Sequence, residues 1–212
     1  YQLTGGLRAA MGYCGAATVE FLYEPTERRF SFMEVNARLQ VEHPVTEMVT
    51  GLDLVKLQLH VAAGGRLEGE PPPATGHAVE ARLNAEDPAL GFAPAPGRIA
   101  LLRLPTGPGV RVDTHGYAGL APSPHYDTLL AKLIVHSPSP HFADALRRAL
   151  RALDECHIDG IATNLALLRA IAARPEFASQ AVHTRFVEAH LADLLAAAAT
   201  LESKRPKKIA PV

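Results

Sequence analysis

Polar and charged side chains occupy every second position of residues 34–42, which read EVNARLQVE. In an extended strand, successive side chains point to opposite faces, so alternate residues share one face. The alternation therefore predicts a strand that carries one line of oxygen and guanidinium groups, here called the polar row. Its members are Glu34, Asn36, Arg38, Gln40 and Glu42.

The residue types differ between the two ends of the polar row. Glu34 and Asn36 offer the hard oxygen ligands that Mg²⁺ and Mn²⁺ prefer. At the other end, Arg38 and Gln40 can clamp a small anion, and Glu42 offers a carboxylate that can act as a general base beside it. The sequence therefore predicts a metal-nucleotide site next to a small-anion site.

A hairpin is predicted immediately before the polar row. Residues 17–23 and 29–35 are rich in strand-forming residue types, and the segment between them, EPTER, has turn composition. Folding this hairpin sets Glu20 opposite Glu34, where two carboxylates about 4.5 to 5.5 Å apart repel unless a cation lies between them. The alternative is a solvated hairpin face with loosely held acids. Asn36, as a third oxygen donor on the same face, favours the metal.

Composition excludes several classes of partner. The chain has 212 residues, and 48% of them are hydrophobic, which is enough for a sizeable core. Since 21 Lys and Arg balance 22 Asp and Glu, and no basic and aromatic residues interleave, no nucleic-acid partner is expected. No apolar run reaches the length of a membrane span, and no signal peptide is recognisable.

The two cysteines bear on the cellular compartment, and the first residues bear on where the chain begins. Cys14 and Cys156 lack the spacing of a zinc site or a disulfide framework, which predicts two buried thiols in a cytoplasmic protein. Leu3, Leu7 and Met11 recur at helical spacing without a preceding initiator Met, so we expect a helix and a start that lies inside a longer protein.

The chain is predicted to divide at a proline-rich segment. Residues 66–76 contain Pro71, Pro72 and Pro73, which fit neither a strand ladder nor a helix interior. Before this segment, two short helices are expected, one ended by Gly51 and the next capped by Asp53. The expected divisions are residues 1–70, residues 76–190, and a helix end with a linker tail over residues 191–212.

The second part is predicted to combine an antiparallel sheet with packed helices, which makes the fold class α+β. Arg111, Asp113 and His115 share one face of a predicted strand, where Arg111 could simply form a surface ion pair. Thr163 or Asn164, and Thr184, are the expected helix caps, and the alanine-rich run over residues 196–200 is expected to decay into the tail. The expected strands are residues 77–83, 98–104, 110–115 and 129–135, and the expected helices are residues 142–153, 165–171 and 186–195.

Longer motifs resemble one enzyme family. Residues 32–47 read FMEVNARLQVEHPVTE, residues 76–88 read GHAVEARLNAEDP, and VRVDTH, YD, KLIV and DGIATN follow in order. This series is similar to biotin carboxylase, the ATP-grasp component of biotin-dependent carboxylases. The similarity covers roughly residues 1–190, which would hold the C-terminal part of an ATP-grasp domain and then the biotin carboxylase C-terminal domain.

The resemblance implies a role for each candidate site residue. Arg38, Gln40, Val41 and Glu42 would hold bicarbonate, with Glu42 as its general base, and Arg111 would neutralise the oxygen of the biotin enolate. The ligands of the Mg²⁺ or Mn²⁺ that bridges the phosphates of ATP would be Glu20, Glu34 and Asn36. Leu22 and Thr184 match positions near the adenine ring.

The resemblance also implies partners, and it implies that the chain alone is inactive. The family's N-terminal half, with its phosphate flap and lysines, has no counterpart here, so the chain alone should hydrolyse no ATP in the presence of bicarbonate. Expected partners are that missing half, a biotin carboxyl carrier domain, a carboxyltransferase of an acyl-CoA carboxylase of fatty acid metabolism, and a second copy in a homodimer. The local wall of the biotin site over residues 116–125 departs from the family pattern.

Three alternatives compete with this interpretation. Another ATP-grasp ligase, such as a carbamoyl-phosphate or purine-pathway enzyme, would share the acidic ligands but would not need residues 76–164. A non-catalytic binding or dimerisation module would not need intact Glu34, Arg38 and Glu42. A hydrolase built on Ser123 and His125 lacks the nucleophile elbow that such enzymes use.

Overall fold

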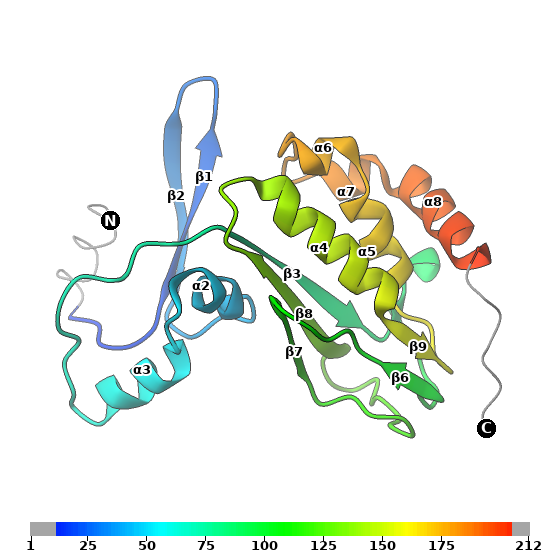
Figure 1. The fold of residues 1–212 in the computed structure, drawn as a ribbon, viewed down its shortest axis with the longest axis horizontal. Helices are drawn as coiled ribbons and strands as arrows, with labels where there is room; N and C mark the ends of the chain where they lie inside the picture. Colours follow the sequence, from blue (N-terminus) through cyan, green and yellow to red (C-terminus); the bar gives the residue numbers. More distant parts are fainter. Residues whose placement is uncertain (1–11, 205–212) are drawn as a thin grey trace. The chain divides into compact units, whose positions relative to one another are not determined.

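The computed structural model describes residues 12–204, and the chain divides into two units, Tyr1–Ala74 and Thr75–Val212 (Figure 1). The predicted helix around Leu3, Leu7 and Met11 lies outside the described residues. Across residues 12–204, no helix combines the length and the apolar character that crossing a bilayer requires.

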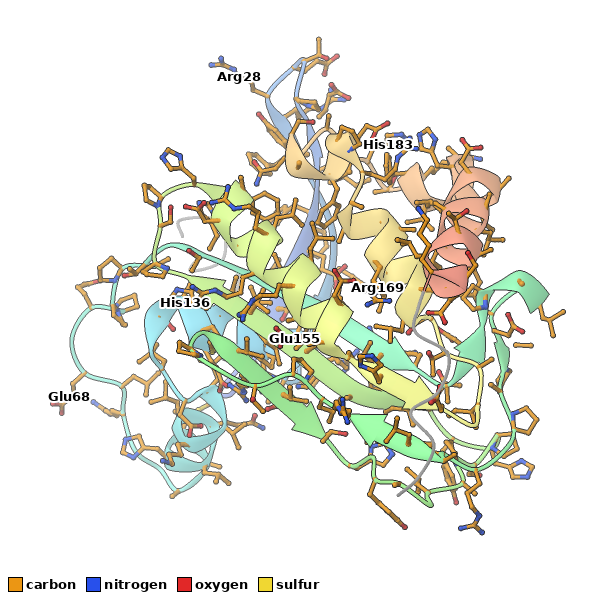
Figure 2. The ribbon with its side chains drawn as sticks, turned by 45° about the vertical axis from the view of Figure 1, so that its right-hand side comes forward. Arg28, Glu68, His136, Glu155, Arg169 and His183 are labelled. Atoms are coloured by element: carbon orange, nitrogen blue, oxygen red, sulfur yellow. The ribbon has the colours of Figure 1, made fainter. Side chains whose placement is uncertain are left out.

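The first unit contains the predicted hairpin. Strand β1 (Thr18–Glu24) pairs antiparallel with β2 (Arg29–Asn36), and Glu20 lies opposite Glu34 as predicted. Arg28 lies at the tip of the hairpin and takes a positive φ of 49°, which closes the turn (Figure 2).

A β-bulge lies directly beside the paired acids. The register shifts between Glu20 and Phe21, so that Phe21 pairs with Phe32 and not with Met33. Simple alternation along β2 would put Phe32 on the same face as Glu34, and the extra residue of the bulge moves it to the other face. The rings of Phe21 and Phe32 lie edge to face at 6.1 Å between centroids. The bulge therefore separates an aromatic face of the hairpin from its acidic face.

Two short helices complete the described part of the first unit. Helix α2 (His43–Thr50) ends at Gly51, which takes the left-handed conformation at φ 74°. Helix α3 (Leu54–Ala62) begins at Asp53, whose side chain accepts a hydrogen bond from the backbone N–H of Lys56. That hydrogen bond also lowers the pKa of Asp53. The predicted stop and cap are both confirmed.

The second unit is built on an antiparallel sheet. Its three strands, β3 (His77–Asn84), β8 (Leu129–Ser137) and β7 (Val110–Thr114), lie in the order β3-β8-β7. Two further strand pairs join β4 (Glu86–Asp87) to β5 (Ala93–Pro94) and β6 (Leu101–Arg103) to β9 (His157–Asp159). A 3₁₀ turn, η1 (Pro88–Leu90), follows β4.

Helices cover one face of this sheet. Helix α4 (Phe142–Glu155) packs on β8 and β3, and α5 (Leu165–Ala172) packs on α4 and on α8 (Leu191–Ser203) (Figure 1). Two short helices, α6 (Pro175–Ala178) and α7 (Phe186–Ala189), connect α5 to α8. The core between sheet and helices includes Leu83, Leu133, Leu146, Leu153 and Leu165.

Several expectations were wrong in this unit. The helix predicted over residues 186–195 is interrupted at His190, where α7 ends and α8 begins, and Phe186 in α7 is buried. The alanine-rich run belongs to α8 and does not decay into a tail, since alanine favours helix and Ala198 packs against α5. Asn164 occupies the predicted N-cap position of α5, but its side chain makes no capping hydrogen bond, and the hydroxyl of Thr163 accepts from the backbone N–H of Leu165 at 3.5 Å. Arg185, not Thr184, occupies the N-cap position of α7.

The expectation of two buried thiols was half wrong. Cys156 is buried in the core of the second unit, whereas Cys14 is exposed. Cys14 precedes the first strand in a segment without regular structure, so no sheet or helix covers it. Neither cysteine forms a disulfide.

Candidate functional site

The paired acids of the hairpin are joined by an amide. The Asn36 Nδ2 donates to Glu20 Oε1 at 2.9 Å and to Glu34 Oε1 at 3.1 Å. Strand pairing delivers the two acids from β1 and β2, and Asn36 is the last residue of β2 on the same face. The hairpin therefore brings together the three side chains that the sequence predicted as metal ligands.

This trio fits a hard divalent cation. A single flip of the Asn36 amide would replace the bridging NH₂ group with an oxygen, and the trio would then offer three oxygen donors. Across residues 12–204, His, Cys, Asp and Glu side chains form no group of three suited to a metal ion, so a third ligand must come from another residue type. The amide oxygen of Asn36 would supply it.

The prediction that the polar row forms one continuous strand is wrong. Strand β2 ends at Asn36, and the backbone N–H of Arg38 donates to the carbonyl of Asn36 at 2.9 Å, which turns the chain. The chain turns again through Val41 and Glu42 before α2 begins. Strict alternation therefore fails after Asn36, because local turns replace the ladder where the partner strand stops.

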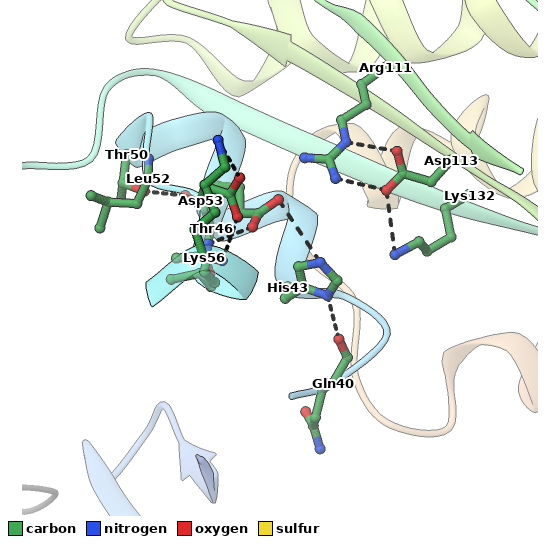
Figure 3. Close-up of polar contacts among 12 residues, drawn as sticks. Gln40, His43, Thr46, Thr50, Leu52, Asp53, Lys56, Arg111, Asp113 and Lys132 are labelled. Atoms are coloured by element: carbon green, nitrogen blue, oxygen red, sulfur yellow. Dashed lines mark hydrogen bonds and ion pairs between the residues drawn. The ribbon is translucent and has the colours of Figure 1, made fainter. Parts of the chain in front are cut away.

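Three members of the polar row nevertheless line one cavity. Arg38, Gln40 and Glu42 contribute to the wall of a cavity of about 470 Å³ in the first unit. The side chain of Gln40 also donates to Glu20 Oε1 at 3.3 Å. The predicted anion end is thus hydrogen-bonded to the predicted metal end. Figure 3 shows Gln40 at the start of α2.

Sequence reasoning missed two residues near this cavity. His43 Nδ1 lies 2.7 Å from the carbonyl oxygen of Gln40, and its Nε2 lies 3.9 Å from Glu47 Oε2 (Figure 3). Glu47 is only 8% exposed, and its Oε1 accepts from the backbone N–H of Leu54 at 2.7 Å. The i to i+4 spacing of His43 and Glu47 on a predicted helix was the available signal.

In the second unit, Arg111 is held by Asp113. The Nε and Nη2 of Arg111 donate to the two carboxylate oxygens of Asp113, both at 2.8 Å, and Lys132 Nζ lies 3.6 Å from Asp113 Oδ2. The hydrogen bonds from Arg111, together with the charge of Lys132, hold the pKa of Asp113 below its usual range. The ion pair expected for Arg111 exists, and it fixes the plane of the guanidinium group.

The remaining predicted site residues lie on three different segments of the chain. Leu22 is about half exposed on the hairpin, and Val41 is partly buried in the turn before α2. Thr184 is exposed in the second unit, just before α7.

Family comparisons agree with this arrangement of units. The biotin carboxylase C-terminal domain matches residues 80–189, and the ATP-binding domain of the carbamoyl-phosphate synthase L chain matches residues 6–70. A biotin carboxylase of Nostoc sp. is 47% identical over 180 residues, which are 84% of this chain and 40% of the relative. The alpha3 subunit of a biotin-dependent acyl-coenzyme A carboxylase from Mycobacterium leprae is 46% identical and is covered to 30%.

A solved structure gives the same result in three dimensions. The biotin carboxylase domain of the 2-oxoglutarate carboxylase from Hydrogenobacter thermophilus, a dimer in complex with MgADP, ADP and bicarbonate, aligns with a TM-score of 0.86 and 39% identity. The alignment covers 91% of this chain and 42% of that domain. The chain spans about 40% of the length of its curated relatives. On this evidence, the chain belongs to the biotin carboxylase family.

Proposed function

We propose that this chain supplies the bicarbonate site and part of the ATP site of a biotin carboxylase, which carboxylates biotin with ATP and bicarbonate. One observation carries the proposal: the bridged trio of Glu20, Glu34 and Asn36 is hydrogen-bonded through Gln40 to the cavity that Arg38 and Glu42 line. A nucleotide cation and a small anion would therefore bind side by side. Bound Mg²⁺ or Mn²⁺ would neutralise the charge of the phosphates.

The residues of the cavity suit the first chemical step. Arg38 would hold bicarbonate through two N–H donors, and Glu42 would take the proton of its hydroxyl group. The bicarbonate oxygen then attacks the γ-phosphorus as the bond to ADP breaks, which yields carboxyphosphate. Two reactants held in one geometry need no diffusive encounter, which is the advantage of placing both sites on one hairpin and turn.

The second step concerns biotin. Carboxyphosphate splits into CO₂ and phosphate, the phosphate takes the proton of the ureido nitrogen, and that nitrogen attacks CO₂. Arg111 would stabilise the negative charge that develops on the ureido oxygen. Asp113 supports this assignment, because it fixes the guanidinium plane from one edge. Val41 would complete the bicarbonate site, and Leu22 and Thr184 would lie near adenine.

The assembly around the chain is part of the proposal. We place the chain in a protein that also contains the N-terminal half of the enzyme, that forms a homodimer, and that acts in the cytoplasm with a biotin carrier domain and a carboxyltransferase. The Mycobacterium leprae relative supports an acyl-CoA as the final acceptor. The solved Hydrogenobacter thermophilus domain, described as a dimer, supports the homodimer. Two cysteines that form no disulfide suit a reducing compartment.

The test is a Glu42→Gln substitution in the full-length protein that contains this chain. Loss of a general base lowers turnover by about 10² to 10⁴-fold, so carboxylation of free biotin should fall by that factor while binding of ATP persists. Incorporation of ¹⁴C-bicarbonate and fluorescent-nucleotide titration measure the two properties. Glu27→Gln, the same chemical change in the exposed turn of the hairpin, is the matched control and should be neutral. Normal carboxylation by Glu42→Gln would refute the proposal.

A further inference from the structure

A short irregular segment carries the proposed bicarbonate residues. Residues 37–42 have neither strand nor helix structure, and they join β2 to α2. Gln40 and Glu42 belong to this segment, and their positions depend on whatever holds its backbone. No strand ladder holds it, so it depends on a few backbone hydrogen bonds within its turns and on side-chain contacts.

Glu42 occupies the N-cap position of α2 without acting as a cap. Its side chain makes no capping hydrogen bond, although an N-cap side chain commonly accepts one from the first turn. A carboxylate used as a cap would be turned toward the helix and away from the cavity. Glu42 instead lines the cavity. The segment therefore needs another anchor to hold it against α2.

His43 provides that anchor. The carbonyl oxygen of Gln40 accepts from both the backbone N–H of His43, at 3.3 Å, and the ring Nδ1, at 2.7 Å. A carbonyl can only accept, so Nδ1 carries the proton in this contact. The Gln40 side chain meanwhile donates to Glu20. The two ends of Gln40 are thus tied to α2 and to the hairpin.

Glu47 faces the imidazole from the other side. Glu47 Oε2 lies 3.9 Å from His43 Nε2, and Glu47 Oε1 accepts from the first backbone N–H of α3. Since Glu47 is almost fully buried, its carboxylate has little room to turn. The contacts form a chain from α3 through Glu47 and His43 to the carbonyl of Gln40.

We propose that His43 is a positioning residue for bicarbonate, oriented by Glu47 and acting through the backbone of Gln40. It sets where Gln40 and Glu42 stand relative to Arg38 without touching the substrate. The inference rests on the proposed function, because it concerns the affinity of the same cavity for bicarbonate. It assigns to His43 a role in substrate affinity rather than in proton transfer.

Two substitutions of His43 separate its two ring nitrogens. Asn places an amide donor near the position of Nδ1, so His43→Asn keeps the contact with the Gln40 carbonyl. Gln places its amide near the position of Nε2. His43→Gln therefore keeps a polar group beside Glu47 and loses the hydrogen bond to the Gln40 carbonyl. Loss of one such hydrogen bond corresponds to about three- to tenfold in affinity.

The experiment uses the full-length protein and measures KM for bicarbonate and for ATP separately. We expect His43→Gln to raise the KM for bicarbonate by about three- to tenfold with little change in the KM for ATP, and His43→Asn to stay within about twofold of wild type. Hydrogen exchange of the backbone over residues 37–43 should accelerate in His43→Gln alone. Thermal unfolding of each variant shows whether it is folded.

The outcomes distinguish this inference from the proposed function. A wild-type protein without bicarbonate-dependent carboxylation refutes the proposed function. An active wild type with an unchanged bicarbonate KM in His43→Gln overturns the positioning role. Equal increases in both KM values, or a His43→Gln protein that does not fold, would also overturn it, since His43 would then support the fold as a whole.

Discussion

The two units differ in how their side chains are held. In the second unit, an apolar core lies between the sheet and the helices, and Leu133 at its centre is 2% exposed. Among residues 12–74, only Pro44 and Glu47 are buried, while Phe30 and Phe32 are 60% and 54% exposed. The proposed metal and bicarbonate residues all lie in the first, thinly packed unit. Strand pairing and hydrogen bonds position them, not a core.

Separate production of the two units is the strongest way to test this contrast. Residues 75–212 contain the entire core and should unfold in one cooperative transition. Residues 1–74 should show no cooperative transition, because an isolated two-stranded hairpin is marginally stable in water. Circular dichroism during heating measures both. A cooperative transition in residues 1–74 would show that the contrast in burial does not reflect a contrast in stability.

Matched truncations in the two units sharpen the comparison. Leu133→Ala leaves a cavity in the core and should lower the free energy of unfolding of the second unit by about 2 to 5 kcal/mol. Phe32→Ala removes a larger side chain from the exposed face of the hairpin and should change the free energy of unfolding of the intact chain by less than about 0.5 kcal/mol. Urea unfolding of the intact chain gives both values. If the two substitutions lowered the free energy of unfolding by similar amounts, the exposed Phe32 would contribute to stability as much as a core residue, which would contradict the contrast.

A buried amide in the second unit should have an intermediate effect. Asn164 is 8% exposed, accepts from the backbone N–H of Asn84 at 2.9 Å and donates to the carbonyl of Arg82 at 2.9 Å. Asn164→Ala leaves both backbone groups without this partner and should lower the free energy of unfolding by about 1 to 3 kcal/mol. Asn164→Asp keeps the acceptor alone and serves as the control. It should retain the contact with Asn84, and a loss as large as that of alanine would contradict the assignment.

The smallest expected effect is a dependence on acid. Because Arg111 lowers the pKa of Asp113 in the folded chain, the charged form of Asp113 is favoured by folding. This stabilisation is complete above the ordinary value of 3.8 and is lost as the pH falls below it, through the lower folded-state pKa. The free energy of unfolding of Asp113→Asn should therefore approach that of wild type as the pH falls below 3.8. A difference that is constant with pH would exclude the ion pair as its cause.

Much of the site could be predicted from the sequence because it depends on short-range order. The pairing of Glu20 with Glu34 follows from a hairpin of two strand-forming segments around one turn, and the structure confirms it. The stop at Gly51 and the cap at Asp53 are local as well. Strand pairing across one turn, helix stops and helix caps depend on residue types and spacings that are visible in a short stretch of sequence.

Other features depended on partners that are distant in the sequence. Asn164 has the residue type of a helix cap, yet its side chain bonds to β3, which lies some eighty residues earlier. His190 lies within a helical pattern, yet the helix breaks there as Phe186 enters the core. The preference of an ordinary residue for helix is worth less than about 1 kcal/mol. Burial of a large apolar side chain or a hydrogen bond within the core can exceed it.

The sequence by itself determined the candidate ligand types, the pairing of Glu20 with Glu34 and the family of this protein. Only the tertiary structure decided that the polar row turns after Asn36 and that His43 and Glu47 anchor the segment that follows. The physical reason is that a strand persists only while its ladder has a partner. β1 begins at Thr18, opposite Asn36, so the backbone that follows Asn36 must find other hydrogen bonds, and the side chains that supply them cannot be recognised from alternation alone.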